Sequence, residues 1–211
     1  MGTVERRERE KESRKQAIIA AAEEVIFSKG YDHATMDDIA EKAELSKGTL
    51  YLYFKSKEEV YIAIILRAMQ IMGRLFEEAV TGQPNGLLKV RAIGEAYMKF
   101  HREYPNYYQA MMYFSKMQID ADSPAGAELK AFHKNKDVMD LFIDSIKEGI
   151  NDGSLRSDLS PEHTAIILWG ATSGLLQLIT LKGNALDHHF NVLPEDVINY
   201  FMSFILRGLK T

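Results

Sequence analysis

The chain has 211 residues, a net charge of −4 and 46% hydrophobic residues, so it can bury one large core or two small ones. It has no cysteine, which excludes a disulfide framework, a thiolate nucleophile and a cysteine-based metal site. The acidic balance also argues against a strongly basic nucleic-acid surface, so any DNA binding must rest on a local group of cations.

The first fifteen residues mix arginine, lysine and glutamate, and almost no apolar residue interrupts them. No apolar segment follows, so the stretch is not a secretory signal. Two interpretations stay open, namely a solvated, frayed helix start with i,i+4 ion pairs or a basic arm that touches DNA. The interleaved glutamates favour the first, and we expect residues 1–12 to be disordered. The cations of such an arm are Arg6, Arg7, Arg9, Arg14 and Lys15.

A helix is predicted over residues 16–29, ended by Gly30, and two short helices follow between Thr35 and Phe54. Thr35 can cap the first of these, and Asp38 can close a capping box. Ser46 can cap the second, which runs over 47–54. Its polar outer surface and its start at Gly48 are typical of a helix that reads the major groove. The alternative is a hairpin buried in an α-helical core, which does not need such a surface.

This segment, from about Gln16 to Val60, resembles the DNA-binding domain of the TetR family of transcriptional regulators. The residues that carry the resemblance are Ala22, Phe27, Gly30, Tyr31, Thr35, Ile39, Ala40, Ala43, Ser46 to Tyr51, Tyr53, Phe54, Lys57 and Glu58. The resemblance implies a dimeric, ligand-responsive regulator, most often a repressor, on a palindromic operator in double-stranded DNA. We expect the DNA contacts to come from Thr35, Ser46, Lys47, Gly48, Thr49, Tyr51, Tyr53 and Lys57.

The remaining chain reads as further helices over residues 56–80, 87–104, 106–118, 124–152 and 194–209, with one more that opens at Ser160-Pro161. Loops are predicted at 81–86 and 182–193. No segment alternates with period two, so the expected fold is all-α. We expect a three-helix helix-turn-helix domain over residues 1–55 and a larger ligand-binding and dimerisation domain over 56–211.

Residues 164–181 carry no charge, so a membrane span has to be weighed. The stretch is at the short limit of roughly 18–20 residues and contains hydroxyl, amide and glycine residues. A helix that is apolar on all sides is more often buried on two sides. We therefore expect a cytoplasmic protein with no membrane contact, in which the last two helices form a homodimer and the small residues Gly170, Ala171, Ser173 and Gly174 allow close approach. The alternative is that these helices fill a monomeric core.

Large flexible and aromatic residues gather on the middle helices, which suits an adaptable apolar or aromatic effector. The same residues would also serve as plain core packing. The resemblance places a pocket among these helices, and its candidate wall is Met69, Met72, Phe76, Tyr97, Phe100, His101, Tyr108, Met111, Phe114, Phe142, Trp169 and Gln177, with Tyr107 beside them. Ligand binding would change the spacing of the two helix-turn-helix domains of the dimer. The helix over 56–80 would transmit the change between the two domains of each chain.

Catalysis is poorly supported, because no nucleophile, zinc-protease or phosphate-loop motif is present. We expect no enzyme activity, no cofactor and no metal. A metal site at His188-His189 would lack a carboxylate partner. Two alternatives stay open: a protein-interaction adaptor that has kept this fold without binding DNA, and a small-molecule enzyme that uses the aromatic cavity.

Overall fold

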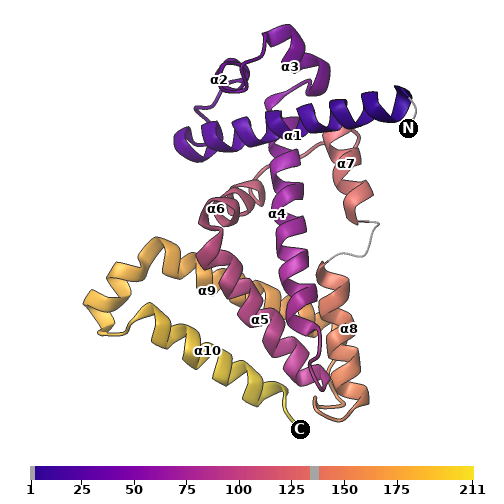
Figure 1. Ribbon diagram of the computed structural model, residues 1–211. Coiled ribbons are helices and arrows are strands. Elements are labelled where there is room, and N and C mark those ends of the chain that lie inside the picture. Colours follow the sequence, from indigo (N-terminus) through magenta and orange to yellow (C-terminus); the bar gives the residue numbers. More distant parts are fainter. Residues whose placement is uncertain (1–2, 134–137) are drawn as a thin grey trace. The chain divides into compact units, whose positions relative to one another are not determined.

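The computed structural model describes residues 3–133 and 138–211, and its regular elements there are all helices (Figure 1). The all-α prediction is therefore confirmed. One isolated bridge joins Leu155 and Lys210. The helices are α1 (Thr3–Lys29), α2 (Met36–Lys42), α3 (Lys47–Tyr53), α4 (Lys57–Val80), α5 (Gly86–Glu103), α6 (Pro105–Phe114), α7 (Pro124–His133), α8 (Val138–Asn151), α9 (Pro161–Phe190) and α10 (Pro194–Leu209).

The chain forms two compact units. The first contains residues up to 69 together with 106–134, and the second contains 70–105 together with the chain from 135 onward. The helices α1, α2, α3, α7, most of α6 and the first half of α4 thus belong to the first unit. The boundary predicted between residues 55 and 56 falls inside this unit.

The core of the first unit joins the N-terminal helices to α6. Ile18, Ile39, Leu50 and Ile64 are fully buried in one cluster that also includes Ala110 of α6. The hydroxyl of Tyr61 donates a 2.9 Å hydrogen bond to the carbonyl oxygen of Ala110, and burial raises the pKa of this phenol. Because a buried hydroxyl needs a partner, α6 is part of the support on which α2 and α3 rest.

In the second unit α5 packs along α8, and α8 packs against α9. The start of α5 meets the end of α8 at two glycines, where a Cβ on Gly86 would lie 2.0 Å from the backbone nitrogen of Gly149. The carboxylate of Asp152 then accepts a 2.8 Å hydrogen bond from the Gly86 amide. Only glycine allows this approach of two backbones.

Two segments differ from the sequence-based expectation. The helix α1 begins at Thr3, so residues 3–12 of the expected disordered arm are helical, and residues 1–2 lie outside the described part. An i,i+4 ion pair between Arg6 and Glu10 supports this start. The helix α9 continues to Phe190 through most of the predicted loop 182–193. No proline interrupts it, and the left-handed residue after its end is Asn191, with φ 52°.

The long helix predicted over 124–152 corresponds to α7 and α8, and residues 134–137 between them lie outside the described part. The side chain of His189, one of the two histidines of the candidate metal site His188-His189, also lies outside the described part.

Candidate nucleic-acid interface and effector cavity

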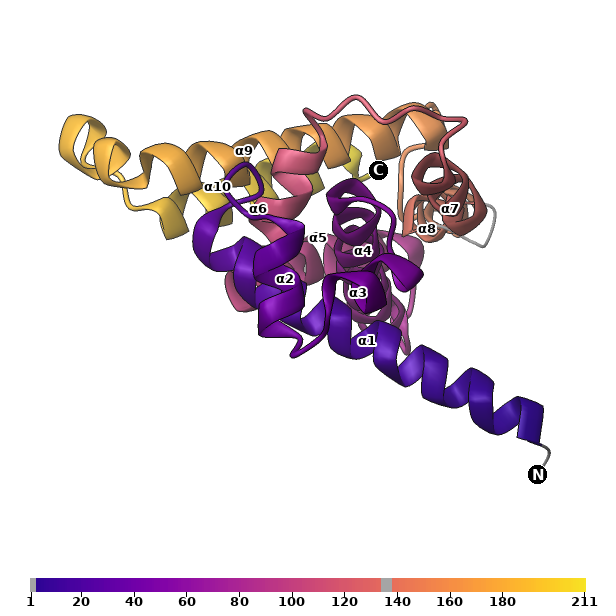
Figure 2. The ribbon, with the colours of Figure 1, turned by 90° about the horizontal axis from the view of Figure 1, so that it is seen from above.

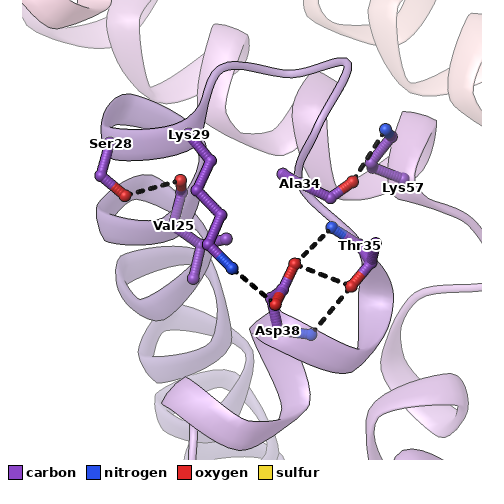
Figure 3. A network of polar contacts seen from close by, with 7 residues as sticks. All are labelled: Val25, Ser28, Lys29, Ala34, Thr35, Asp38 and Lys57. Carbon is purple, nitrogen blue, oxygen red and sulfur yellow. Dashed lines mark hydrogen bonds and ion pairs between the residues drawn. The ribbon is translucent and has the colours of Figure 1, made fainter.

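A capping box holds the start of α2 (Figure 3). The Thr35 hydroxyl accepts a 3.1 Å hydrogen bond from the Asp38 amide, and the Asp38 carboxylate accepts a 3.0 Å bond from the Thr35 amide. The Lys29 ammonium donates to the same carboxylate at 2.7 Å. The bonds from Lys29 and from Thr35 lower the pKa of Asp38 to about 2. Thr35 therefore has a structural task in addition to its predicted phosphate contact.

The helix α3 presents a polar outer face above a buried inner one. Leu50 and Phe54 are buried, as their i,i+4 spacing predicts. Ser46 caps the helix, and its side-chain oxygen accepts a 3.1 Å bond from the Thr49 amide. The hydroxyls of Ser46 and Thr49 lie 2.9 Å apart. Around Gly48, an added Cβ would meet only the Ser46 hydroxyl at 3.9 Å, so the start of the helix is open to an approaching surface.

The other predicted contact residues divide by exposure. Tyr51 is 41% exposed, and Lys47 is exposed and forms an ion pair with Asp37. Tyr53 is half-buried against the core of the unit. Leu52 is 74% exposed and was not predicted as a contact, although a large apolar side chain in this position is a sign of a covered surface. The face is therefore available to a partner along Lys47, Gly48, Tyr51 and Leu52.

Lys57 has a different environment from the one expected. Its ammonium donates hydrogen bonds of 2.6 and 2.9 Å to the carbonyl oxygens of Tyr31 and Ala34, and a longer one of 3.4 Å to that of Asp32. It also lies 4.3 Å from the centroid of the Tyr31 ring. A lysine has three donors, and all three are directed at the loop before α2. Lys57 therefore stabilises the loop that precedes α2. Its ammonium has no donor left for the predicted phosphate contact.

We expect Lys57→Met to lower the free energy of unfolding by about 2 kcal/mol, because three charge-assisted bonds to partly exposed carbonyls are lost. Urea denaturation followed by circular dichroism measures this. Lys55→Met is the control, since the Lys55 ammonium donates to one exposed carbonyl, that of Tyr51. Unchanged stability together with lost DNA binding would restore Lys57 as a phosphate contact.

The predicted ligand wall is divided between the two units. Met69, Tyr108, Met111 and Phe114 belong to the first unit, and the other eight residues belong to the second. In the second unit the ring of Tyr97 stacks on Trp169 at 4.7 Å, and Phe76 meets both rings edge-on at 6.4 and 6.5 Å. The Tyr97 hydroxyl lies 3.0 Å from that of Ser173, and burial raises the pKa of Tyr97.

A cavity of about 1090 Å³ lies elsewhere in the second unit, between α4, α5, α9 and α10. Of the predicted wall only His101 lines it, and its Nε2 is 2.8 Å from the Thr180 hydroxyl. Burial lowers the pKa of His101. Sequence reasoning missed this cavity because its apolar wall consists mostly of small or aliphatic residues. Its lining includes the apolar residues Leu75, Ala92, Ala96, Leu176, Ile179 and Ile198, the cations Lys99 and Arg102, and the carboxylates Glu78, Glu95 and Glu195.

Two models of known protein families match this chain. Residues 18–64 match the model of the bacterial regulatory proteins of the tetR family, and residues 90–203 match that of the tetracyclin repressor-like C-terminal domain. The chain belongs to the TetR family. Members of this family are dimeric transcriptional regulators that bind operator DNA and small-molecule ligands.

Several named proteins are similar to this TetR-family chain. The transcriptional activator FasR of Mycolicibacterium smegmatis is 26% identical over 185 residues, which cover 77% of this chain and 84% of FasR. The structure of FadR from Bacillus subtilis with stearoyl-CoA has a TM-score of 0.71 at 19% identity, covering 92% of this chain and 98% of that one. The structure of AibR with isovaleryl coenzyme A and operator DNA has a TM-score of 0.67 at 18% identity, covering 90% and 97%. The structural likenesses show a shared fold.

By length and composition alone, one helical segment of the described residues, Pro161–Gly183, could cross a membrane, and 17% of its most apolar stretch is buried. A single such helix is weak support for a membrane protein. Its exposed apolar surface instead has to be explained by what covers it.

Proposed function

We propose that this TetR-family protein is a homodimeric regulator that binds a palindromic operator through α3 and releases it when a small amphipathic effector binds. The observation that carries the proposal is the exposed outer face of α3, held on a buried inner face and two side-chain caps. A single head of this size covers little DNA, and two heads on successive turns of the duplex provide the necessary affinity. We propose further that the protein acts as a repressor in the cytoplasm and has no enzyme activity.

The dimer surface that we propose lies on α9 and α10. On α9 the residues Ile166, Ile167, Leu178 and Leu181 are 45–68% exposed and share one face of the helix. Gly170 and Gly174 lie in the middle of that face, and a Cβ added to either would meet no atom within 4 Å. Their lack of side chains has no use within one protomer, but it allows the helix of a second protomer to approach closely.

The helix α10 has the same pattern. Tyr200 is 75% exposed and Phe204 66% exposed, and Gly208, four residues on, is open as well. Two neighbouring helices with exposed apolar stripes match a symmetric four-helix contact, as the sequence predicts. Ser173, by contrast, bonds to Tyr97 and serves the interior of the unit.

For the effector we propose a molecule with an apolar chain and an anionic group. The cavity beside α5 combines aliphatic walls with the cations Lys99 and Arg102 and with the carboxylates Glu78, Glu95 and Glu195. The support for an anionic group therefore comes from the ligands of two proteins of similar fold. FadR and AibR were solved with acyl thioesters of coenzyme A, which have this combination. The apolar or aromatic part predicted from the sequence corresponds to the tail. The aromatic cluster of Phe76, Tyr97 and Trp169 lies in the same unit, although these rings do not line the cavity.

The test is a mobility-shift titration with a duplex selected from a random-sequence pool by the wild-type protein. We expect a shift that stearoyl-CoA or a shorter acyl-CoA reverses, whereas free coenzyme A at equal concentration does not. Trp169 is the single tryptophan and stacks on Tyr97, so its fluorescence should change on addition of the same effector. Failure to select or shift any duplex at any salt concentration would favour the adaptor, and stable binding with every acyl-CoA would refute the effector class.

A further inference from the structure

The helical start of α1 separates charges that alternate in the sequence. On a helix, Arg7, Lys11 and Arg14 follow the i, i+4, i+7 spacing and share one face, which leads into the buried Ile18. Glu5, Glu8 and Glu12 share a different face. The segment alternates in charge as a sequence, but as a helix it gathers Arg7, Lys11 and Arg14 on one side, while these glutamates and Arg9 lie on another.

The basic side borders an open groove within the first unit. Its volume is about 1080 Å³, and its walls are the start of α1, the turn Ala43 to Leu45 and Tyr53. Figure 2 shows α1 continuing beyond α2 and α3 toward its N-terminal end. The groove therefore joins the exposed part of α1 to Tyr53, the last residue of α3.

Among the described residues, the three cations of this side have no partner. Arg6 bonds to Glu10 at 2.7 Å, but Arg7, Lys11 and Arg14 make no hydrogen bond or ion pair to any described residue and are exposed. Like charges at i,i+4 destabilise a helix slightly. The stability of the folded chain therefore does not explain why Arg7, Lys11 and Arg14 form a basic stripe on α1. Binding to an anionic partner does explain it.

We propose that Arg7, Lys11 and Arg14 bind backbone phosphates of the duplex next to the bases read by α3. The inference rests on the proposed function, and it extends the interface to a segment outside α2 and α3. Seven residues of helix span about 10 Å, and each DNA strand carries one phosphate per about 3.4 Å of its axis. The stripe therefore has the length of about three phosphates. It also gives a chain of net charge −4 a local cationic surface.

The test compares the variant Arg7→Ala/Lys11→Ala/Arg14→Ala with wild type on the selected duplex in two lengths. One duplex is trimmed to the selected bases, and the other has ten extra base pairs on each side. We expect the variant to lose about tenfold in affinity on the long duplex near 0.1 M salt and less on the trimmed one. The slope of log K against log salt should become shallower by about 3 per protomer, since each lost phosphate contact removes about 0.9.

The matched control is Glu5→Ala/Glu8→Ala/Glu12→Ala, with the same number of alanines on the other face of the same helix. It should bind at least as tightly as wild type. Circular dichroism should show both variants as helical as wild type, since alanine favours helix. A cation variant with the wild-type slope and affinity on both duplexes would overturn the inference alone. An equal loss in the control would do the same, whereas a wild-type protein that binds no duplex would overturn the proposed function.

Discussion

Substituting Gly174 with glutamate is expected to convert the dimer into monomers and to weaken operator binding by about 100-fold or more. Gly174 lies in the middle of the exposed apolar face of α9, and an added Cβ meets open space within the protomer. The protomer itself should not suffer, because replacing a glycine inside a helix gains about 0.5–1 kcal/mol of helix propensity. A second protomer, however, would have to bury an unpaired carboxylate against Ile167 and Leu178.

Light scattering after size exclusion gives the oligomeric state, and the mobility shift gives the affinity. Gln70→Glu, which adds the same charge at an exposed position of α4, should leave both unchanged. A Gly174→Glu protein that remains dimeric with wild-type affinity would place the dimer contact elsewhere. A monomeric variant that binds the operator as tightly as wild type would show that the second head adds nothing.

Among the ion pairs described here, a large stability loss is expected from a change at Glu23 of α1. Its carboxylate accepts a 2.7 Å bond from the Arg67 guanidinium of α4 and a 2.8 Å bond from the Tyr107 hydroxyl of α6. The side chains of Glu23 and Arg67 are only 12% and 23% exposed. Burial and the bond to this carboxylate raise the pKa of Tyr107 to about 12, so the phenol stays a donor at neutral pH.

We expect Glu23→Leu to lower the free energy of unfolding by about 2–4 kcal/mol, because it leaves the partly buried Arg67 without its counter-ion. Adding Arg67→Met should recover part of the loss, since both charges are then gone. The control is the neighbouring Glu24→Leu, whose ion pair with Lys42 is 64% and 47% exposed and should contribute less than about 1 kcal/mol. Urea denaturation at one fixed protomer concentration measures all four proteins. Equal losses in Glu23→Leu and Glu24→Leu would contradict the role of burial.

The helices α2 and α3 could be predicted from the sequence because contacts between residues close in the chain determine them. Thr35 with Asp38 and Ser46 with Thr49 are caps that depend on residues three apart, and Leu50 with Phe54 depends on one turn of helix. The family assignment followed from the same stretch and is confirmed. The capping role of Asp38 was recognised in the sequence, whereas the role of Lys29 beside it was not.

What the sequence could not supply were contacts between distant segments. The carbonyls that receive Lys57 lie 23–26 residues away, and Glu23 meets Tyr107 across 84 residues. No periodicity encodes such pairs, so the sequence predicts Lys57 as a phosphate contact and places Tyr107 beside the ligand wall. The extent of α9 was missed for a different reason, because Gly183 and Asn184 suggest a loop, whereas the helix passes through both.

The place of α6 in the first unit has a consequence for recombining parts of such regulators. Tyr61 hydrogen-bonds to Ala110, Glu23 to Tyr107 and Asp32 to Tyr113, so the head shares its core with a segment encoded some fifty residues downstream. A hybrid gene joined after residue 55 would graft a foreign α6 onto the N-terminal helices and leave Glu23 and Asp32 without their native partners Tyr107 and Tyr113. An exchange that carries residues 106–133 along with residues 1–69 would keep every one of these pairs, and it is the graft that should yield soluble protein.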